Sequence, residues 1–248
     1  MRIAILIPIH DHGDTIAEVV EALAPAALPC LVVDDGSGSA TQEVLERVAK
    51  ENPFVEVLRR SHNGGKGAAL KSGYRAALAR DFTHVVQLDA DGQHDPRDVP
   101  RFAEALRRAP RALVLGVPSF DASAPRLRIY ARQISRVSVW LACGSRVVPD
   151  PLCGFRGIPL EPAVALIDRV DTGDWMDFDP ELAVRLVWEG LEIVPVPTRV
   201  TYRAGGLSHF SLARDYPRLA SLYTRLIAGM LWRVPARLRG AGERSGAD

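Results

Sequence analysis

The chain has 248 residues with 47% apolar and 25% charged side chains and a formal net charge of +1, which excludes a disordered chain and indicates a globular protein with a large core. Cys30, Cys143 and Cys153 lack C-x-x-C or metal-ligand spacing, so we predict reduced packing cysteines and a cytoplasmic protein. The apolar run Ile3–Ile9 is too short for a signal sequence, and no stretch has the length of a membrane span.

The first half of the chain alternates short apolar runs with amphipathic segments. The apolar runs predict strands at residues 3–8, 31–33, 55–58, 85–88 and 112–115. The intervening segments predict helices that start at Asp14 or Thr15 and that span residues 42–50, 68–79 and 99–107. This alternation predicts an α/β fold, with an open, mainly parallel sheet, helices on both faces and ligands at the carboxyl ends of the strands.

The pattern changes beyond Gly116. An arginine-rich helix follows, and its apolar stripe consists of Leu127, Tyr130, Ile134, Val137 and Leu141. Next we predict a Pro/Gly-rich loop that runs to Gly157 and a helix at residues 162–167. An acidic loop, a helix at residues 180–189 and two strands around Ile193 and Val200 follow.

The stretch VVQLDADGQHDP, residues 85–96, ends an apolar run in two carboxylates, Asp89 and Asp91. Side chains two residues apart at a strand end share a face, so both acids can bind one divalent cation. Carboxylate oxygens suit Mg²⁺ or Mn²⁺, whose open positions accept diphosphate oxygens. The alternative is a solvated turn in which Gly92 takes a positive φ and Asp95 caps the next helix.

Polar residues also follow the first two predicted strands, namely His10, Asp11 and His12 after the first and Asp34 and Asp35 after the second. An acid at such a strand end accepts hydrogen bonds from ribose hydroxyls or base N–H groups. The alternative is that the D-D-G-S sequence forms a turn that only caps the next helix.

The stretch NGGKGAAL, residues 63–70, combines glycines with a lysine at the start of a predicted helix. The glycines let the backbone approach a ligand, and Lys66 offers a positive charge where a helix N-terminus already attracts anions. The spacing of a Walker A loop is absent, so we do not expect a P-loop NTPase.

In order and spacing, IPIHDHGDTI, VVDDGS, NGGKGAAL, LDADGQHDP and DPLCGFRG resemble the family 2 glycosyltransferases over nearly the whole chain. Within that family, the chain is most similar to dolichyl-phosphate mannose synthases and their bacterial polyprenyl-phosphate relatives. The resemblance implies a GT-A fold, a GDP- or UDP-linked sugar donor and inversion at the anomeric carbon. The Q-x-x-R-W signature of processive synthases is absent, which favours transfer of a single sugar.

The resemblance also assigns residues to the donor. Those expected at the nucleoside are Pro8, His10, His12, Val33 and Asp35. Those expected at the diphosphate and at Mg²⁺ or Mn²⁺ are Asp89, Ala90, Asp91 and Gln93, with the metal held by Asp89, Asp91 and Gln93. Lys66, Arg203 and His209 are expected at the phosphates.

Three departures from the family pattern bear on the donor. Asp11-His12 replaces the usual Asn-Glu, which puts base selectivity in doubt. Pro118 stands where an arginine is common after the fifth strand, so one donor contact is missing. His209 replaces a lysine, so its charge depends on pH.

The acceptor class can be argued from whether the acceptor group needs a general base. A hydroxyl needs a general base, whereas a lipid phosphate is already an anion at neutral pH. We expect a polyprenyl-type lipid phosphate bound by Arg128, Arg132 or Arg136, and the alternative for these arginines is a solvated basic face. Transfer to a hydroxyl of a lipid, polyketide-like or saccharide acceptor is the second hypothesis.

Further catalytic candidates lie in the second half of the chain. Candidate bases are Asp177, Asp179 and Glu181 in the acidic loop, with Asp150 before the GFR motif. The resemblance matches Asp150 and Arg156 to a loop beside the sugar and Glu181 to a recurrent acid, which join Asp89 and Asp91 as expected catalytic residues. The alternative for the acids is helix capping and solvation. A sugar nucleotidyltransferase is not expected, because its arginine-bearing glycine-rich loop is missing, and a non-catalytic nucleotide-sugar binding module is the remaining rival.

We divide the chain into a glycosyltransferase domain, residues 1–211, and a basic amphipathic helix with a tail, residues 212–248. The helix is expected to begin near Asp215 and Pro217 and to end at Pro235. Its apolar stripe consists of Leu219, Leu222, Tyr223, Leu226, Ile227, Met230, Leu231 and Val234. The stripe can pack on the core, or it can lie on the cytoplasmic face of a membrane with arginines near anionic head groups. No nucleic-acid partner is expected.

Overall fold

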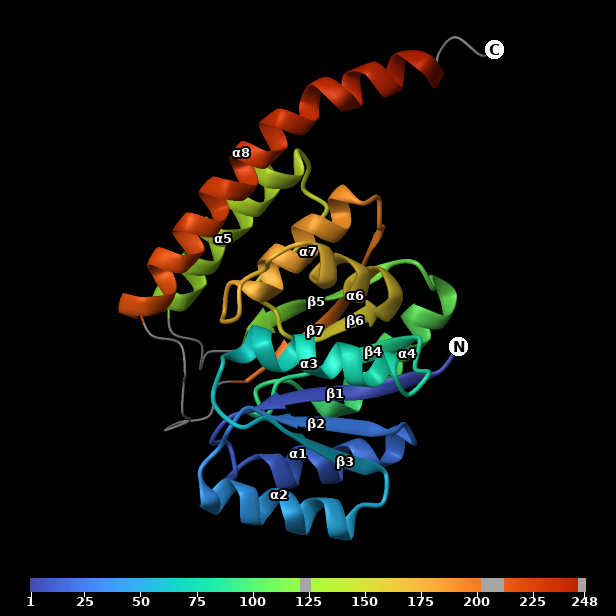
Figure 1. Ribbon diagram of the computed structural model, residues 1–248, viewed down its shortest axis with the longest axis vertical. Helices are drawn as coiled ribbons and strands as arrows, with labels where there is room; N and C mark the ends of the chain where they lie inside the picture. The colour runs from blue at the N-terminus through green and yellow to red at the C-terminus, as the bar shows by residue number, and fades with distance from the viewer. Residues whose placement is uncertain (121–125, 202–211, 245–248) are drawn as a thin grey trace.

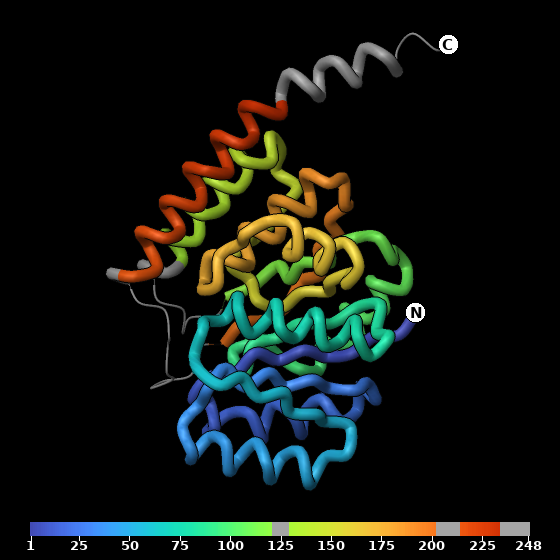
Figure 2. The backbone as a smooth tube through the Cα atoms, viewed as in Figure 1, coloured from blue at the N-terminus to red at the C-terminus, as the bar shows by residue number. Residues whose placement is uncertain are grey.

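The computed structural model describes residues 1–120, 126–201 and 212–244, except for the side chains of residues 126–128, 212–213 and 234–244 (Figures 1 and 2). Across these residues seven strands form one sheet in the order β3-β2-β1-β4-β6-β5-β7. The strands are β1 Ile3–Ile9, β2 Cys30–Asp34, β3 Val55–Arg59, β4 His84–Gln87, β5 Leu113–Phe120, β6 Arg156–Pro159 and β7 Ile193–Val200. Neighbouring strands run parallel except at β6, which is antiparallel to both β4 and β5.

Helices cover both faces of this sheet (Figure 1). One face carries α1 Ile16–Leu23, α2 Ser39–Glu51 and α4 Val99–Arg108, with the short 3₁₀ turns η1 Ala24–Ala26 and η2 Pro96–Asp98. The other carries α3 Lys66–Leu78, α6 Leu160–Arg169 and α7 Phe178–Trp188, and beyond them α5 Arg126–Cys143 and α8 Leu212–Arg244. The mainly parallel α/β fold expected from the sequence is therefore confirmed.

The strand β1 shows why its sequence lacks polar alternation. Successive strand side chains point to opposite faces, and here both faces are covered. Ile5 and Ile7 belong to the core cluster beneath α1 and α4, whereas Ala4 and Leu6 belong to the cluster beneath α3 and α7. All seven residues of β1 are buried.

The parallel register brings several loops to one edge of the sheet. Ile9 pairs with Asp34, and Asp34 pairs with Arg59, so β1, β2 and β3 end at the same level. Leu6 pairs with Gln87, which places the turn after β4 beside the loop after β1.

Three sequence predictions for the second half are wrong. The two strands expected around Ile193 and Val200 are one strand, β7, whose two prolines are tolerated because it lies at the sheet edge, beside β5. The strand β6 lies at the end of the predicted loop, where Gly157 packs against Leu106 with no room for a Cβ. The helix α8 continues past Pro235, which removes one backbone donor without ending the helix.

Helices α5 and α8 lie side by side along one flank of the molecule (Figures 1 and 2). Part of the α8 stripe is buried in the core beneath them, namely Leu219, Leu222, Tyr223 and Leu226. Four residues of the stripe expected on α5 are exposed, namely Tyr130, Ile134, Val137 and Leu141, and the side chain of Leu127 lies outside the described part of the structure. The inward side of α5 is formed by Ser135, Val139, Ala142 and Cys143. Among the described residues, no helix has the length and apolarity to cross a membrane.

Candidate functional site

The loops after β1 and β2 are joined by hydrogen bonds. Asp11, with a left-handed φ of 51°, accepts a hydrogen bond from Gly38 N at its Oδ1, 2.8 Å away, and its own N–H donates to Ser37 Oγ at 3.0 Å. His10 Nδ1 lies 3.1 Å from the carbonyl oxygen of Asp35. These contacts give the first polar segment, predicted to bind the nucleoside, a defined shape at the sheet edge.

The remaining nucleoside candidates lie around this segment. Pro8 and Val33 are paired neighbours in β1 and β2 and are buried, so they form the floor of the edge. The carbonyl of His12 accepts hydrogen bonds that begin α1, including one from Thr15 N at 3.3 Å. The Thr15 hydroxyl donates to the carbonyl of Ala90 at 2.6 Å, which ties the start of α1 to the acidic turn after β4.

Asp35 holds the loop that carries Lys66. Its buried carboxylate accepts hydrogen bonds from Gly64 N at 3.1 Å and from Gly65 N at 2.7 Å, and it pairs with Arg60. Gly65 has a φ of +99°, which a residue with a side chain rarely adopts. Asp35, expected at the base or ribose, thus positions the glycine loop, and its contact with a nucleoside stays a prediction.

Lys66 forms the centre of the site. Its Nζ lies 2.6 Å from Asp89 Oδ1 and 3.0 Å from Asp179 Oδ2. Burial lowers the pKa of Lys66, but the charges of Asp179 and Asp89 and their hydrogen bonds outweigh it, so the pKa lies above its usual value. The ammonium stays protonated at physiological pH and directly faces the first acid of the DAD sequence.

Asp179, which the sequence offered as a candidate base or a helix cap and not as a partner of Lys66, belongs to the same cluster. Gln87 Nε2 donates to its Oδ1 at 3.1 Å, and the hydroxyl of Tyr74 donates to Gln87 Oε1 at 2.5 Å. Burial raises the pKa of Asp179, but Lys66 and Arg156 more than compensate, so its pKa is lowered overall. The residues that form this network come from α3, β4, β6 and α7.

Arg156 supports the site from within the protein. Its guanidinium is fully buried and donates to the carbonyl oxygens of Cys153 at 2.8 Å, Pro151 at 2.6 Å and Asp179 at 2.6 Å. These bonds fasten the loop before β6 to the first turn of α7. The geometry gives Arg156 a positioning role, because its donors are directed to protein carbonyls.

Glu181 is also fully buried, and its carboxylate has partners on both oxygens. Arg185 donates to Oε1 from Nε at 2.9 Å, and Gly173 N donates to Oε2 at 2.9 Å. The structure thus places Glu181 in contact with the acidic loop at residues 171–177, and its role as a catalytic acid or base stays a prediction.

Gly154 lets the loop before β6 approach the acidic turn. A Cβ built on Gly154 would lie 2.7 Å from Asp89 Cγ and 2.8 Å from Lys66 Nζ, well inside van der Waals contact. Only a residue without a side chain fits between them. The DPLCGFRG and LDADGQHDP segments, far apart in sequence, therefore meet at Asp89.

The turn after β4 offers hard oxygen donors for a divalent cation. Asp89 and Asp91 flank Ala90, and Asp91 Oδ1 accepts a hydrogen bond from Gln93 N at 3.0 Å. Within the described residues no group of three or more His, Cys, Asp or Glu could hold a metal ion. Mg²⁺ needs only one or two protein carboxylates when phosphates and water complete its shell. The donor set therefore fits a cation that binds together with a diphosphate.

His94, which the sequence did not single out, follows the acidic turn after β4 and contacts the loop before β6. Its ring packs edge-on against Phe155 with centroids 5.4 Å apart, and its Nδ1 is buried without a hydrogen-bond partner among the described residues. Burial lowers the pKa of His94 to about 4, an effect that Asp89 opposes and that Lys66 and Arg132 increase. The imidazole is therefore neutral at physiological pH.

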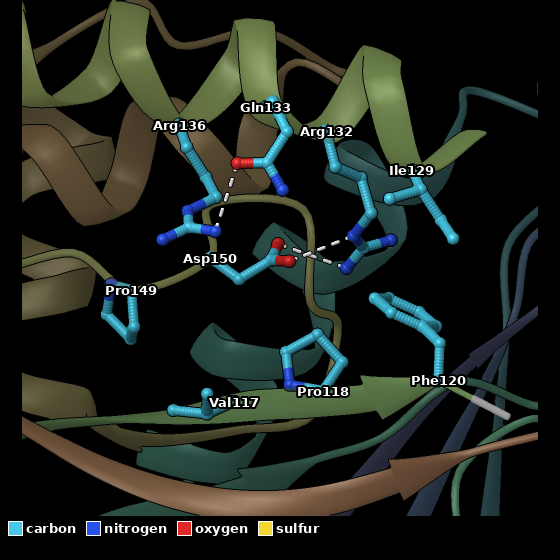
Figure 3. A pocket seen from close by; sticks show the side chains of 9 residues that line it. All are labelled: Val117, Pro118, Phe120, Ile129, Arg132, Gln133, Arg136, Pro149 and Asp150. Carbon is cyan, nitrogen blue, oxygen red and sulfur yellow. Dashed lines mark hydrogen bonds and ion pairs between the residues drawn. The ribbon is translucent and has the colours of Figure 1, made fainter. Parts of the chain in front are cut away.

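A pocket of about 210 Å³ lies beneath α5 (Figure 3). Its lining residues are Val117, Pro118, Phe120, Ile129, Arg132, Gln133, Arg136, Pro149 and Asp150. Arg132 pairs with Asp150 through two hydrogen bonds of 2.8 and 3.0 Å. Arg136 NH1 donates to Gln133 Oε1 at 3.1 Å, while its buried Nε has no acceptor among the described residues. The pocket thus contains one neutralised guanidinium and one with an unused donor.

This pocket and the acidic turn share one loop. Asp150 lines the pocket, and Gly154, four residues later, touches Asp89 and Lys66. Four residues span at most about 14 Å, so the arginine pocket is near the DAD turn. The structure therefore pairs Lys66 with Asp89 and Arg132 with Asp150, and one loop links the two pairs. The functional roles expected of these residues stay predictions. The side chain of Arg128 and the residues Arg203 and His209 lie outside the described part of the structure.

The sheet order, the helices on both faces and the acids at the strand ends define the GT-A class of glycosyltransferases. Residues 4–150 match the sequence profile of Glycosyl transferase family 2. The chain belongs to this family and is a glycosyltransferase.

Two relatives are similar over most of their length. The chain is 36% identical over 222 residues to the undecaprenyl-phosphate mannosyltransferase of Micrococcus luteus, covering 85% of this chain and 88% of that protein. It is 28% identical over 218 residues to the polyprenol monophosphomannose synthase of Mycolicibacterium smegmatis, covering 85% and 81%.

Solved structures share the fold at low sequence identity. The mannosyltransferase PcManGT from Pyrobaculum calidifontis, in complex with GDP-Man and Mn²⁺, has a TM-score of 0.58 at 16% identity and matches 100% of this chain and 76% of that chain. TarS residues 1–349 from S. aureus, in complex with UDP, has a TM-score of 0.61 at 16% identity and matches 93% of this chain and 65% of that chain. The chain thus spans just under two thirds of the TarS structure.

Proposed function

We propose that this glycosyltransferase moves one sugar from a nucleotide-sugar to a polyprenyl-type lipid phosphate, with inversion and with a divalent cation, as a peripheral protein at the cytoplasmic face of a membrane. One observation carries the proposal. The arginine pocket beneath α5 shares the loop 150–156 with the Lys66–Asp89 pair, so an anionic acceptor and a diphosphate donor would lie in adjacent sites. The two relatives, which are named as polyprenyl-phosphate sugar transferases, support the acceptor class.

The donor side of the proposal rests on the turn after β4. Asp89, Asp91 and Gln93 would hold Mg²⁺ or Mn²⁺, and the cation would supply positive charge against the diphosphate. His10, His12 and Asp35, above the floor of Pro8 and Val33, would border the nucleoside. Neighbouring folds that bind GDP-Man with Mn²⁺ or UDP support a nucleotide-sugar donor without deciding the base.

The acceptor side rests on the two arginines of the pocket. Guanidinium groups pair well with phosphate oxygens, and Arg136 has a buried donor to offer. Asp150 offsets the charge of Arg132, which leaves the charge of Arg136 in the pocket. Such a pocket suits a phosphate that carries one or two negative charges. A bound phosphate monoester needs no general base, which fits a site whose buried acids Asp179 and Glu181 are already paired.

In the proposed transfer a phosphate oxygen of the acceptor attacks the anomeric carbon while the bond to the diphosphate breaks. The leaving nucleoside diphosphate gains negative charge in this step. Lys66 remains protonated and lies beside Asp89, so its ammonium is placed where that charge develops. Asp179 holds Lys66 at this position from the opposite side. Attack from the face opposite the leaving group inverts the anomeric configuration.

The test is an assay of the purified protein with a panel of GDP- and UDP-sugars, Mn²⁺, and either a short-chain polyprenyl phosphate or the matching alcohol. Sugar transfer to the phosphate ester, lost on addition of EDTA, is the expected result. The anomeric proton coupling of the product, read by NMR, should show inversion relative to the donor. Transfer to the alcohol with none to the phosphate would establish the hydroxyl-acceptor hypothesis instead.

Asp91→Asn in the same assay should keep the fold and lower turnover by roughly a hundredfold or more, because it removes charge from the cation site. Asp168→Asn is the matched control, since Asp168 is an exposed carboxylate on α6 that pairs with Arg75. Near-normal turnover of Asp91→Asn would show that Asp91 is not a metal ligand.

A further inference from the structure

The helix α5 is apolar on two opposite sides. Its inward side is buried against α7 and α8, and its outward side exposes Tyr130, Ile134, Val137 and Leu141 with relative exposures of 69, 69, 49 and 58%. These four residues follow the spacing i, i+4, i+7 and i+11, so they form one continuous stripe along the helix. A core-facing helix needs only one apolar side, and a soluble surface rarely keeps such a stripe uncovered.

Two residues of α8 extend the apolar surface. Met230 packs against Gly144, directly after the end of α5. The next two residues, Leu231 and Trp232, are 68 and 85% exposed. Tyr130 and Trp232 are also the aromatic types that favour a boundary between apolar and aqueous phases.

The two segments that carry this surface contain basic but no acidic residues. The segment from Arg126 to Pro149 contains five arginines and no acidic residue. The segment from Tyr216 to Arg239 contains five more, again without an acid. Among the described side chains, Arg146, Arg225 and Arg233 are exposed. An apolar stripe bordered by cations complements an anionic lipid leaflet.

We propose that the outward face of α5, extended by Leu231 and Trp232, is the surface by which this protein binds an anionic membrane. The stripe inserts among the lipid head groups and acyl chain ends, and the arginines contact the anionic heads. This assigns membrane binding to α5, whereas the buried half of the α8 stripe belongs to the core.

The position of the pocket agrees with this orientation. Arg132, Gln133 and Arg136 project from α5 into the pocket in Figure 3. A lipid phosphate bound there would keep its hydrocarbon chain close to the helix that lies in the leaflet. Only this link between the pocket and the membrane rests on the proposed function, because the exposed stripe and its charges do not depend on the acceptor.

The experiment uses the full-length protein and sedimentation with two kinds of vesicle, phosphatidylcholine with phosphatidylglycerol and phosphatidylcholine alone. The test variant carries Ile134→Glu and Leu141→Glu. The control carries Leu78→Glu and Lys50→Gln, which change the net charge by the same amount at exposed positions on α3 and α2. A second test variant, Ile134→Ser with Leu141→Ser, removes the apolar side chains without adding charge. Melting curves establish that all variants fold.

Wild type and control should sediment with the anionic vesicles, less with the neutral ones and less at high salt. Both stripe variants should partition at least about tenfold more weakly. Stripe variants that sediment like wild type, or a wild type that ignores anionic vesicles, would overturn the proposal. A wild-type dimer in solution that becomes monomeric in the stripe variants, with no vesicle binding, would identify a second copy of this chain as the occupant.

Activity separates this inference from the proposed function. With a short-chain polyprenyl phosphate in free solution, the stripe variants should match wild type, and they should lose rate only with a long-chain acceptor embedded in vesicles. If wild type transfers sugar to neither phosphate yet binds vesicles through the stripe, the acceptor hypothesis fails while the membrane surface stands.

Discussion

Close packing at one glycine connects the two halves of the site. Gly154 lies where a Cβ would touch both Asp89 and Lys66, so the loop before β6 can reach the acidic turn only without a side chain at this position. The same loop carries Asp150, which borders the arginine pocket. Gly154 therefore sets the spacing between the acidic turn and the arginine pocket.

Gly154→Ala should shift Asp89 or the loop and lower turnover by about tenfold or more, because misplacement of reacting groups by a fraction of an ångström to 1 Å is costly. Steady-state kinetics with both substrates measures the effect. Gly190→Ala is the control, since Gly190 has a φ of +89° but no atom within 4 Å of a built Cβ, and it should reduce stability without changing kinetics. Equal kinetics of the two variants would contradict a role for Gly154 in the site.

At the residue scale the sequence identified the local motifs but not their partners. Lys66 and Asp89 were predicted from the glycines and from paired acids, which are local signals. Asp179 follows Asp89 by 90 positions and Lys66 by 113, and only the placement of α7 beside α3 brings it to Lys66. His94 follows the DAD turn, but nothing in the spacing shows that its ring is buried between charged groups. Signals that depend on tertiary packing are absent from periodicity and motif spacing.

The helix α7 is held to the site by the buried guanidinium of Arg156. Arg156 at the start of β6 donates to the carbonyls of Cys153, Pro151 and Asp179. The sequence assigned Arg156 to catalysis through the resemblance of its motif, and the contacts indicate a structural contribution. A buried guanidinium whose hydrogen bonds replace those with water fixes the loop more firmly than apolar contact alone.

Arg156→Met tests this contribution. Removing the guanidinium leaves three carbonyl oxygens without their donor and leaves Asp179 with one positive neighbour fewer, so unfolding free energy should fall by about 3 to 5 kcal/mol. Urea denaturation followed by fluorescence measures the change. A variant with unchanged stability and lost turnover would instead place Arg156 in direct contact with substrate.

The two long helices show where periodicity stops being informative. Both α5 and α8 have an apolar stripe, and the sequence located both stripes. The α8 stripe is buried through Leu226, whereas the α5 stripe faces outward and less regular residues such as Val139 and Ala142 face the core. Periodicity shows which residues share a face but not what covers that face. The α/β class was easier to predict, because β1, β2 and β4 contain short apolar runs and β3 begins with an alternating one.

For the whole molecule, the question is whether α8 is an appendage or part of the fold. The division of the chain at residue 211 stays a prediction from sequence. In the structure Leu219, Leu222, Tyr223 and Leu226 belong to the same core cluster as β1, α3 and α7. Arg214 and Arg218 also stack on Trp175 of the acidic loop, at 4.5 and 4.9 Å from its ring centre.

Two truncations measure the contribution of α8. A chain that stops before Tyr216 loses the four buried side chains, each worth about 1.5 to 3 kcal/mol, so the loss of roughly 6 to 12 kcal/mol rivals the whole stability of a domain. We expect this product to be insoluble or to melt without a cooperative transition. A chain that stops after Arg233 keeps all four and should melt close to full length in a calorimeter. A soluble short chain with a cooperative transition would show that residues 1–215 fold alone and that α8 is an appendage.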